Sequence, residues 1–283
     1  MKIGSEAHKR LFCGMFFDHH RPYEPAELGW PTLDGETLAL LRGLPFWTHA
    51  LQAEEDAGPM ITACAAREPD PMVRRALELQ AFEEARHARI IRHMIERYAL
   101  HADEIHVEVP DDAVEAFIDF GFEECLDSFG AFGLFKLARE HLLVPEALFE
   151  IFDRVMQEEA SHIVFFLNWF AYRQAHRGVL SRAFRHPKAL QHYLRAVRKL
   201  AGLAFSKETD EGKDFIVTGA DAFVDNLTPG VVLTACLEEN TRRLAEFDRR
   251  LLAPRFAPRM ARVALGIITR LPRRNGHRLA ERR

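Results

Sequence analysis

Glu83-Glu84-Ala85-Arg86-His87 is the stretch that decides the fold, because the chain nearly repeats it further on as Glu158-Glu159-Ala160-Ser161-His162. In each copy the second glutamate stands three residues before the histidine, which places both side chains on one face of an α-helix, where they can bind one metal ion. Although the chain has 14 histidines, no other glutamate stands three residues before one. Helix bundles that bind a metal pair through two such motifs add one glutamate from each of two further helices.

Helical periodicity and capping residues predict those four helices. The two copies of the motif fall on the second and the fourth. The expected helices run from Pro45 to about Ala65, from Asp70-Pro71 to about Tyr98, from Asp111 or Asp112 to about His141, and from Pro145 to about His176. Residues 99–112 are expected to be a connection that carries His101 and His106 at the surface.

Helical phase also indicates which further carboxylates face inward. In the first helix Glu54 lies on the apolar stripe, whereas its neighbours Glu55 and Asp56 point away from it. A carboxylate on a buried stripe is costly unless it is paired or binds a metal ion, although a salt bridge at the edge of the stripe would also explain this one. In the third helix the phase favours Glu124, with Glu123 and Asp127 as the alternatives.

The repeated motif resembles the ligand signature of the ferritin-like di-iron carboxylate superfamily, which includes soluble di-iron oxygenases, ribonucleotide reductase small subunits and rubrerythrins. In the oxygenase and reductase branches an acid precedes Glu-x-Arg-His, and residues 83–87 match this form, whereas the second copy carries Ser161 in place of the arginine. The resemblance covers about residues 45–176. It implies an all-α fold, a ferritin-like four-helix bundle with a central dinuclear metal site plus extra C-terminal helices. The implied metal ligands and catalytic residues are Glu54, Glu84, His87, Glu124, Glu159 and His162.

The same resemblance implies how these ligands divide between two ions. Glu84 and Glu159 would bridge the metals, Glu54 and Glu124 would be closer to terminal ligands, and each histidine would bind one metal. Carboxylates together with imidazoles suit iron or manganese better than calcium or magnesium, and zinc also accepts such ligands. The expected cofactor is therefore two Fe ions, with Mn as the alternative in one or both positions.

The acid that precedes each Glu-x-x-His motif has an expected role of its own. The resemblance places Glu83 and Glu158 where each would hydrogen-bond the histidine of the opposite helix, orient its ring and raise its basicity. Arg86 would pair with one of the two acids. The alternative interpretation of Glu83 and Glu158 is that they are exposed charges on their helices.

Composition is that of an ordinary globular protein. The chain has 283 residues, of which 48% are apolar and 28% charged, and its 22 phenylalanines predict an aromatic interior. Its four cysteines form no Cys-x-x-Cys pair, which argues against a disulfide framework and against a rubredoxin-type or zinc-ribbon site. Because no apolar run has the length of a signal peptide or a membrane span, we expect a cytoplasmic protein.

The chain outside the bundle divides into three parts. Residues 1–44 are expected to be an N-terminal strap with one short helix near 36–41, in which His19 and His20 have structural or surface roles. Residues 45–178 are the predicted bundle. Residues 179–253 are expected to be additional helices that pack on the bundle or form a homodimer, at about 189–205 and 229–252, joined by a polar linker at 206–213. Glu238 and Glu239 are interpreted as solvated charges on the last of these helices.

The last part, residues 254–283, is an Arg-rich C-terminal tail. It carries nine arginines against the single Glu281, a local charge of +8, which leaves −12 on the rest of the chain because the whole chain carries −4. Apolar residues alternate with these arginines. Docking on the acidic body is the favoured interpretation, whereas contact with nucleic acid or an anionic membrane is the less favoured one.

The resemblance implies a non-haem di-iron oxidase or oxygenase that uses dioxygen and an external electron donor to oxidise a small, apolar substrate, and the acid before each motif and the additional helices favour this interpretation. The alternative is a ferritin- or rubrerythrin-like protein that oxidises iron or removes peroxide, and a tRNA hydroxylase is less favoured. Four aromatic residues near the predicted site fit either a substrate pocket or, preferably, ordinary core: Phe132, Phe135, Phe166 and Trp169.

Overall fold

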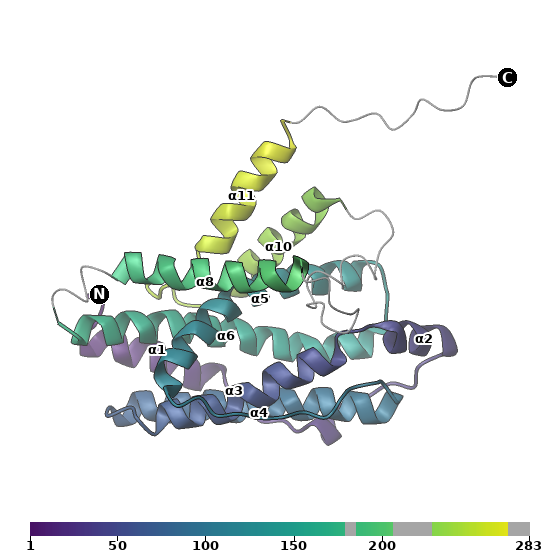
Figure 1. The fold of residues 1–283 in the computed structure, drawn as a ribbon, viewed down its shortest axis with the longest axis horizontal. Helices are drawn as coiled ribbons and strands as arrows, with labels where there is room; N and C mark the ends of the chain where they lie inside the picture. Colours follow the sequence, from purple (N-terminus) through teal and green to yellow (C-terminus); the bar gives the residue numbers. More distant parts are fainter. Residues whose placement is uncertain (179–184, 206–227, 271–283) are drawn as a thin grey trace.

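The computed structural model describes residues 1–178, 185–205 and 228–270, and no β-strand occurs among them. Four long helices form the centre of the fold: α3 (Trp47–Ala65), α4 (Pro71–Tyr98), α5 (Ala113–Glu140) and α6 (Glu146–His176). α3 packs along α4 and α5 against α6, while α3 also contacts α5 and α4 contacts α6 (Figure 1). The predicted all-helical fold is therefore confirmed for the part of the chain that the structure describes.

The ends of the four long helices follow the capping residues in the sequence. Asp70 caps α4 by accepting from the backbone N–H groups of Met72 and Val73, and Asp112, rather than Asp111, caps α5. α3 begins two residues later than expected, at Trp47, whose indole donates to the carbonyl of Leu41.

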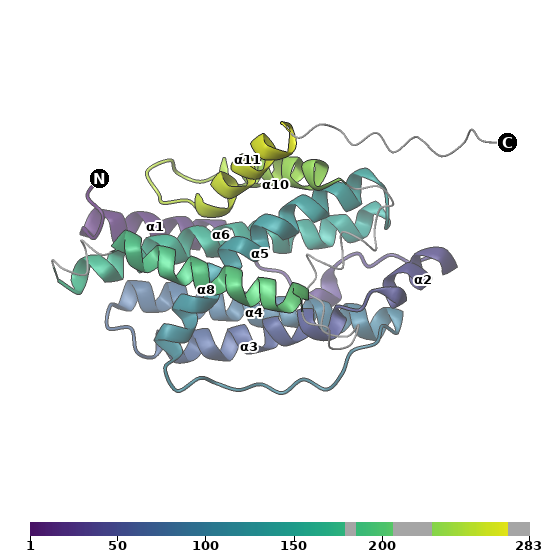
Figure 2. The same cartoon turned by 45° about the horizontal axis from the view of Figure 1, so that its top comes forward.

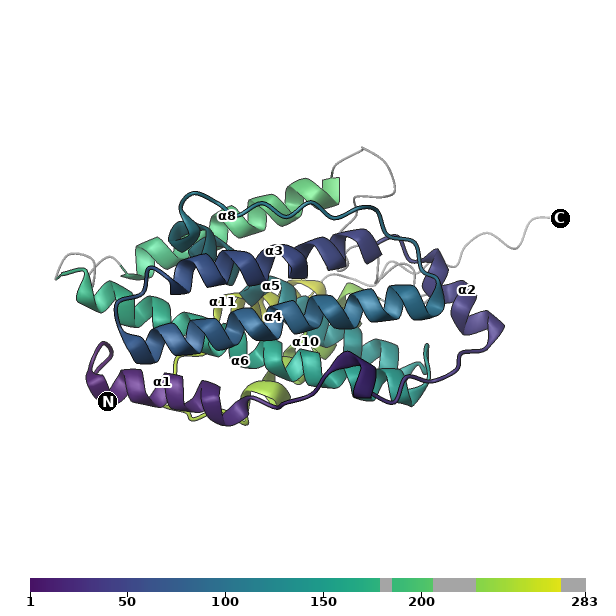
Figure 3. The same cartoon turned by 90° about the horizontal axis from the view of Figure 1, so that it is seen from below.

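The connection at 99–112 has no regular secondary structure and runs beside α3 (Figure 3). Thr48 and Gln52 of α3 hydrogen-bond to Asp103 and to the backbone of His106. Both His101 and His106 are exposed, as predicted. These contacts fix the long connection against the helix that carries Glu54.

The strap predicted at residues 1–44 contains a helix that the sequence analysis missed. This helix, α1 (Glu6–His19), packs against α6 and α4, and a 3-10 turn, η1 (Pro25–Glu27), and α2 (Gly35–Gly43) follow it. Ser5 caps α1, and Phe12 and Phe16 are almost fully buried. The apolar stripe of α1 is interrupted by His8, whose buried ring hydrogen-bonds to Asn168 at 3.0 Å.

Three further helices cover α5. α8 (Arg185–Phe205) and α10 (Pro229–Leu244) both pack on it, and α11 (Phe256–Ile268) contacts α10 and α5 (Figure 2). α10 ends at Leu244, so the expectation of a helix reaching about Leu252 was wrong. The predicted linker 206–213 and residues 271–283 of the tail lie outside the described residues.

Glu239 of α10 corrects a second expectation. Glu238 is exposed, as predicted, but Glu239 is buried. Glu239 accepts from Arg242 and lies 2.9 Å from Arg243. Arg243 also donates to Asp153 of α6. A buried carboxylate is tolerated because these arginines neutralise it. Glu239 is therefore not a solvated charge, and Arg243, which it neutralises, joins α10 to α6.

The apolar face of α11 points outward along part of its length. Met260, Val263 and Ile267 are each more than half exposed, whereas Ala261 is buried. No described helix is both long enough and apolar enough to cross a membrane.

Replacing Gly133 by alanine should destabilise the protein, because α5 and α10 approach closely there. A Cβ at this position would lie 2.7 Å from the backbone N and Cα of Cys236, so one helix would have to shift. We expect the free energy of unfolding to fall by about 1–3 kcal/mol, measured by denaturant titration. Gly14→Ala, also inside a helix but with nothing within 4 Å of its Cβ, is the matched control and should be neutral or slightly stabilising. Equal effects at both positions would contradict the close packing of α10 on α5.

Candidate metal centre

Four buried side chains meet between α4 and α6. Glu84 and His87 come from α4, and Glu159 and His162 from α6. One donor atom from each lies within 4.8 Å of the other three, a spacing at which all four could bind metal. The two Glu-x-x-His motifs therefore face each other, as the sequence predicts.

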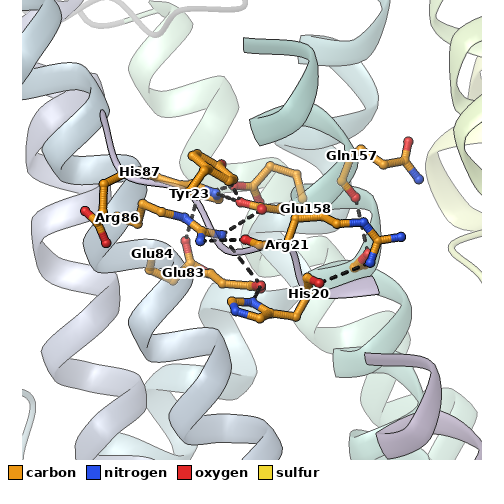
Figure 4. A network of polar contacts seen from close by, with 12 residues as sticks. His20, Arg21, Tyr23, Glu83, Glu84, Arg86, His87, Gln157 and Glu158 are labelled. Atoms are coloured by element: carbon orange, nitrogen blue, oxygen red, sulfur yellow. Dashed lines mark hydrogen bonds and ion pairs between the residues drawn. The ribbon is translucent and has the colours of Figure 1, made fainter. Parts of the chain in front are cut away.

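Each histidine ring is held by the acid of the opposite helix. Nε2 of His87 lies 2.8 Å from Oε2 of Glu158 (Figure 4). Nε2 of His162 lies 2.9 Å from Oε2 of Glu83. This crossed pairing is the one expected from the acid that precedes each motif. Arg86 donates to Glu158 at 2.7 Å, so the partner of this arginine is the acid of the second copy.

The hydrogen bonds at Nε2 leave the other ring nitrogen of each histidine directed at the carboxylates. Nδ1 of His87 lies 2.9 Å from Glu159, and Nδ1 of His162 lies 3.1 Å from Glu84. Neither Nδ1 has a hydrogen-bond partner of acceptable geometry, and Oε2 of Glu159 has none either. Buried polar atoms without partners are rare in proteins, and here they converge on one point. A metal ion bound by these atoms would satisfy all of them.

Glu54 lies at the edge of this group. Its Oε2 is 3.6 Å from Nδ1 of His87, and its side chain is 21% exposed. Glu55 pairs with Arg92 and Asp56 with Gln52, so both point away from the centre, as predicted.

Glu124 of α5 is half-buried, lines the same cavity as Glu54, Glu84 and Glu159, and lies outside the group of four converging ligands. Of its two alternatives, Glu123 forms a 2.6 Å ion pair with Lys199 of α8 and so is directed elsewhere. Asp127 lines the cavity one turn further along α5.

Electrostatics at the centre separate the six predicted ligands into two groups. Burial lowers the pKa of His87 and of His162, but their carboxylate neighbours outweigh burial and raise both pKa values well above the usual range. Burial likewise opposes ionisation of Glu84, yet the two histidines lower its pKa. By contrast, burial raises the pKa of Glu54 to about 8, against the effect of His87, and burial together with Glu159 and Glu84 raises that of Glu124 well above its usual range.

Filling the centre with metal should therefore release protons. Carboxylate neighbours raise the pKa values of His87 and His162, burial raises those of Glu54 and Glu124, and each of these groups must be deprotonated to become a ligand. Affinity for metal should therefore rise with pH through the raised pKa of Glu54, about 8, with protons released as the metal binds. Calorimetric titration with Mn²⁺ in buffers of different ionisation enthalpy measures the number. Metal binding without proton release near pH 7 would contradict these charge states.

Residues of the strap complete the hydrogen bonds around the two outer acids. Nδ1 of His20 lies 2.6 Å from Glu83, and the hydroxyl of Tyr23 donates to Glu158 at 2.9 Å (Figure 4). The carbonyl of Arg21 accepts from Arg86. His20 thus has a structural role, as the sequence analysis favoured, but its contact with Glu83 was not foreseen because nothing in the local sequence links two residues so far apart.

The sequence analysis did not identify Gln80 as a residue of the site, although its helical phase, one turn before Glu84, indicates that it faces the centre. It is buried one turn before Glu84 on the same face of α4, and its amide donates to Oε1 of Glu84 at 3.1 Å. This contact orients one of the carboxylates of the centre.

A cavity of about 310 Å³ opens onto the carboxylates. Phe132 and Phe135 line it, whereas Phe166 and Trp169 do not and are fully or almost fully buried in the core. The four aromatic residues that the sequence could not separate therefore divide into two groups. Apart from the carboxylates and a few polar groups beside them, the cavity is lined by apolar side chains.

No protein family model, curated protein or solved structure matches this chain.

Proposed function

We propose that the chain is a ferritin-like di-iron oxidase or oxygenase that oxidises an apolar molecule with dioxygen and electrons from an external donor. In this proposal α3, α4, α5 and α6 are the four helices of a ferritin-like bundle. The observation that carries it is the meeting of two crossed Glu-x-x-His motifs with an apolar cavity at the same carboxylates. A pure packing role would leave no reason for the converging unpartnered atoms or for the cavity.

The donor set suits a pair of iron or manganese ions. Carboxylate oxygens and neutral imidazoles are ligands that both metals accept, and four carboxylates balance the charge of two divalent ions. Glu84 and Glu159 each lie between 2.9 and 3.7 Å from both histidines and would hold the pair together with Glu54 and Glu124. A pair of ferrous ions would supply the two electrons that activate dioxygen.

The residues of the chain orient the histidine rings, exclude water from the cavity and hold protons beside the centre. Glu83 and Glu158 accept from Nε2 of the histidines, which keeps Nδ1 available for a metal. Apolar residues such as Phe132 and Ile90 exclude water from the side of the cavity where a substrate would react. Glu54 and Glu124, whose pKa values are raised, can hold protons at the edge of the centre.

Oxygen uptake tests the proposal. Protein loaded with ferrous iron should consume dioxygen once it receives electrons from a chemical reductant, and apolar molecules that fit the cavity should change the rate. The Glu84→Ala variant should consume none beyond the rate of free iron. Iron-loaded parent protein that consumes no more dioxygen than this variant would refute the assignment.

Iron storage or detoxification is the second candidate. It is favoured by a second cavity of about 340 Å³ that is lined by Glu124 and Asp56, although two further acids of its lining are already paired, Asp119 with Arg195 and Glu123 with Lys199. The number of irons bound after repeated cycles of ferrous iron and air separates the two functions. An oxygenase should stop near two per chain, whereas a storage protein should take up many more.

A further inference from the structure

α11 has two apolar faces, and only one of them is used in packing. On the inner face, Ala261 is 4% exposed and joins Phe129 of α5 and Cys236 of α10 in a small core cluster. At the C-terminal end of α11, a Cβ on Gly230 of α10 would lie 4.0 Å from Ile268, so this end also rests on α10. These contacts of the inner face account for how the helix is held on the protein.

The outer face of α11 is an aliphatic stripe that stays exposed. Met260, Val263 and Ile267 are 53%, 58% and 56% exposed. Because a helix turns about 100° per residue, these three side chains fall within an arc of about 60°, centred about 130° from Ala261. α11 lies at the outer edge of the molecule in both Figure 1 and Figure 2. The stripe can therefore be reached by a surface outside the protein.

A basic face adjoins this stripe. Arg259 and Arg262 are exposed and lie about 60° apart around the helix, centred about 100° from the stripe. No Asp or Glu occurs between Pro254 and Arg270. Within the part of the chain that the structure describes, no acidic side chain forms an ion pair with any arginine of this segment: Arg255, Arg259, Arg262 and Arg270. The buried, aliphatic and basic faces thus each take about a third of the circumference, and the described body does not neutralise the basic one.

This combination of faces fits an anionic lipid surface better than other partners. Lipid phosphates accept from arginines while aliphatic side chains enter the boundary between headgroups and acyl chains. Nucleic acid would pair with the arginines but leave the aliphatic stripe in water. A helix of 13 residues is about 20 Å long and about 10 Å wide, so its outer face covers about 200 Å², well short of the roughly 800 Å² per partner of a stable dimer.

We propose that α11 binds this protein to an anionic membrane surface. The helix lies in the plane of the interface, with Met260, Val263 and Ile267 toward the acyl chains and Arg259 and Arg262 at the lipid phosphates. Residues 271–283 carry five further arginines against the single Glu281, and their charge adds to the attraction. The inference does not depend on the proposed function, because it uses no residue of the metal centre.

Co-sedimentation with lipid vesicles tests the proposal on the whole chain. Vesicles of equal parts phosphatidylcholine and phosphatidylglycerol should bind it at least about tenfold more tightly than vesicles of phosphatidylcholine alone, because each arginine near an anionic surface contributes about fivefold. Added salt should weaken the binding. Equal binding to both compositions, or binding to neither, would overturn the proposal. Failure to bind vesicles together with tight binding of single-stranded RNA would assign the basic face to nucleic acid instead.

Paired charge reversals locate the contact. Arg259→Glu combined with Arg262→Glu should lower the affinity for the anionic vesicles at least about 25-fold, which is about fivefold for each lost arginine. Arg10→Glu combined with Arg75→Glu makes the same change in net charge at exposed positions of α1 and α4, and should cost no more than a few-fold. Equal losses in the two double variants, measured on samples with the thermal stability of the parent, would show that overall charge and not α11 makes the contact.

A fluorescent label tests whether the aliphatic stripe enters the membrane. The four native cysteines are buried, so Val263→Cys provides a single accessible thiol for an environment-sensitive fluorophore. Its emission should rise and shift to the blue on anionic vesicles, whereas the same label on Val109→Cys, 53% exposed in the connection at 99–112, should not respond. Vesicle binding without a change at position 263 would overturn the proposal. A blue shift that follows protein concentration in the absence of lipid would show that a second copy covers this face instead.

Discussion

Protein produced with iron should contain close to two irons per chain, and the Glu84→Ala and His162→Ala variants should retain almost none after dialysis. Glu84 lies 3.1 Å from His162 and 3.7 Å from His87, so it serves both histidines. Loss of an outer hydrogen-bond partner typically lowers metal affinity about 10–100-fold, and loss of a ligand that serves both ions should cost at least as much. Metal analysis per chain measures the result.

Glu78→Ala is the matched control for these variants. Glu78 lies on the same helix, α4, but is exposed and lines neither cavity. Its iron content should equal that of the parent. If the Glu84 and His162 variants also bound iron like the parent, the converging side chains would be a feature of packing and the metal assignment would be wrong.

The sequence was sufficient to predict the part of the centre that depends on helix periodicity. Glu84, His87, Glu159 and His162 sit three residues apart in pairs, and a helix forces each pair onto one face. The crossed pairing of Glu83 and Glu158 followed from the same geometry together with the family resemblance, and both contacts are present at under 3 Å. A local repeat of this kind can be predicted from the sequence because it does not depend on contacts between distant residues.

Residues that reach the centre from distant parts of the chain could not be predicted in this way. His20 and Tyr23 contact the outer acids only because α1 packs against α6 and brings the strap across α4, and α1 itself has a weak apolar stripe. Glu239 looked like a surface charge because its burial becomes visible only once α10 packs on the bundle, although its partners Arg242 and Arg243 stand three and four residues further along the same helix. Tertiary contacts, not local pattern, decide these positions.

The third-helix ligand shows where phase alone reaches its limit. Glu124 and Asp127 are three residues apart on α5, and both line the cavity at the metal centre. Helical phase in the sequence favoured Glu124 as the ligand, and Glu123 forms an ion pair with Lys199 instead. Burial, followed by the charges of Glu159 and Glu84, raises the pKa of Glu124.

Arg86→Met should lower the free energy of unfolding of the metal-free protein by about 3–5 kcal/mol, because it removes the arginine that, together with His87, compensates the charge of the buried Glu158. Arg86 is fully buried and donates to Glu158 at 2.7 Å and to the carbonyl of Arg21 at 2.9 Å. Its guanidinium also stacks 3.9 Å from the centroid of the Tyr23 ring. Denaturant titration gives the size of the loss. Arg89→Met, one turn away in an exposed pair with Glu24, should cost no more than about 1 kcal/mol.

A second substitution shows whether the loss comes from the uncompensated charge of Glu158. Adding Glu158→Gln to Arg86→Met removes that charge, so the double variant should be more stable than Arg86→Met alone, although the amide no longer matches His87 as well as the carboxylate does. If the double variant were instead less stable by the sum of the two single losses, Arg86 would act through packing on Tyr23 rather than through charge. Recovery of stability together with weakened metal binding would show that Glu158 is kept ionised to hold His87, and that Arg86 is the residue that makes this buried charge tolerable.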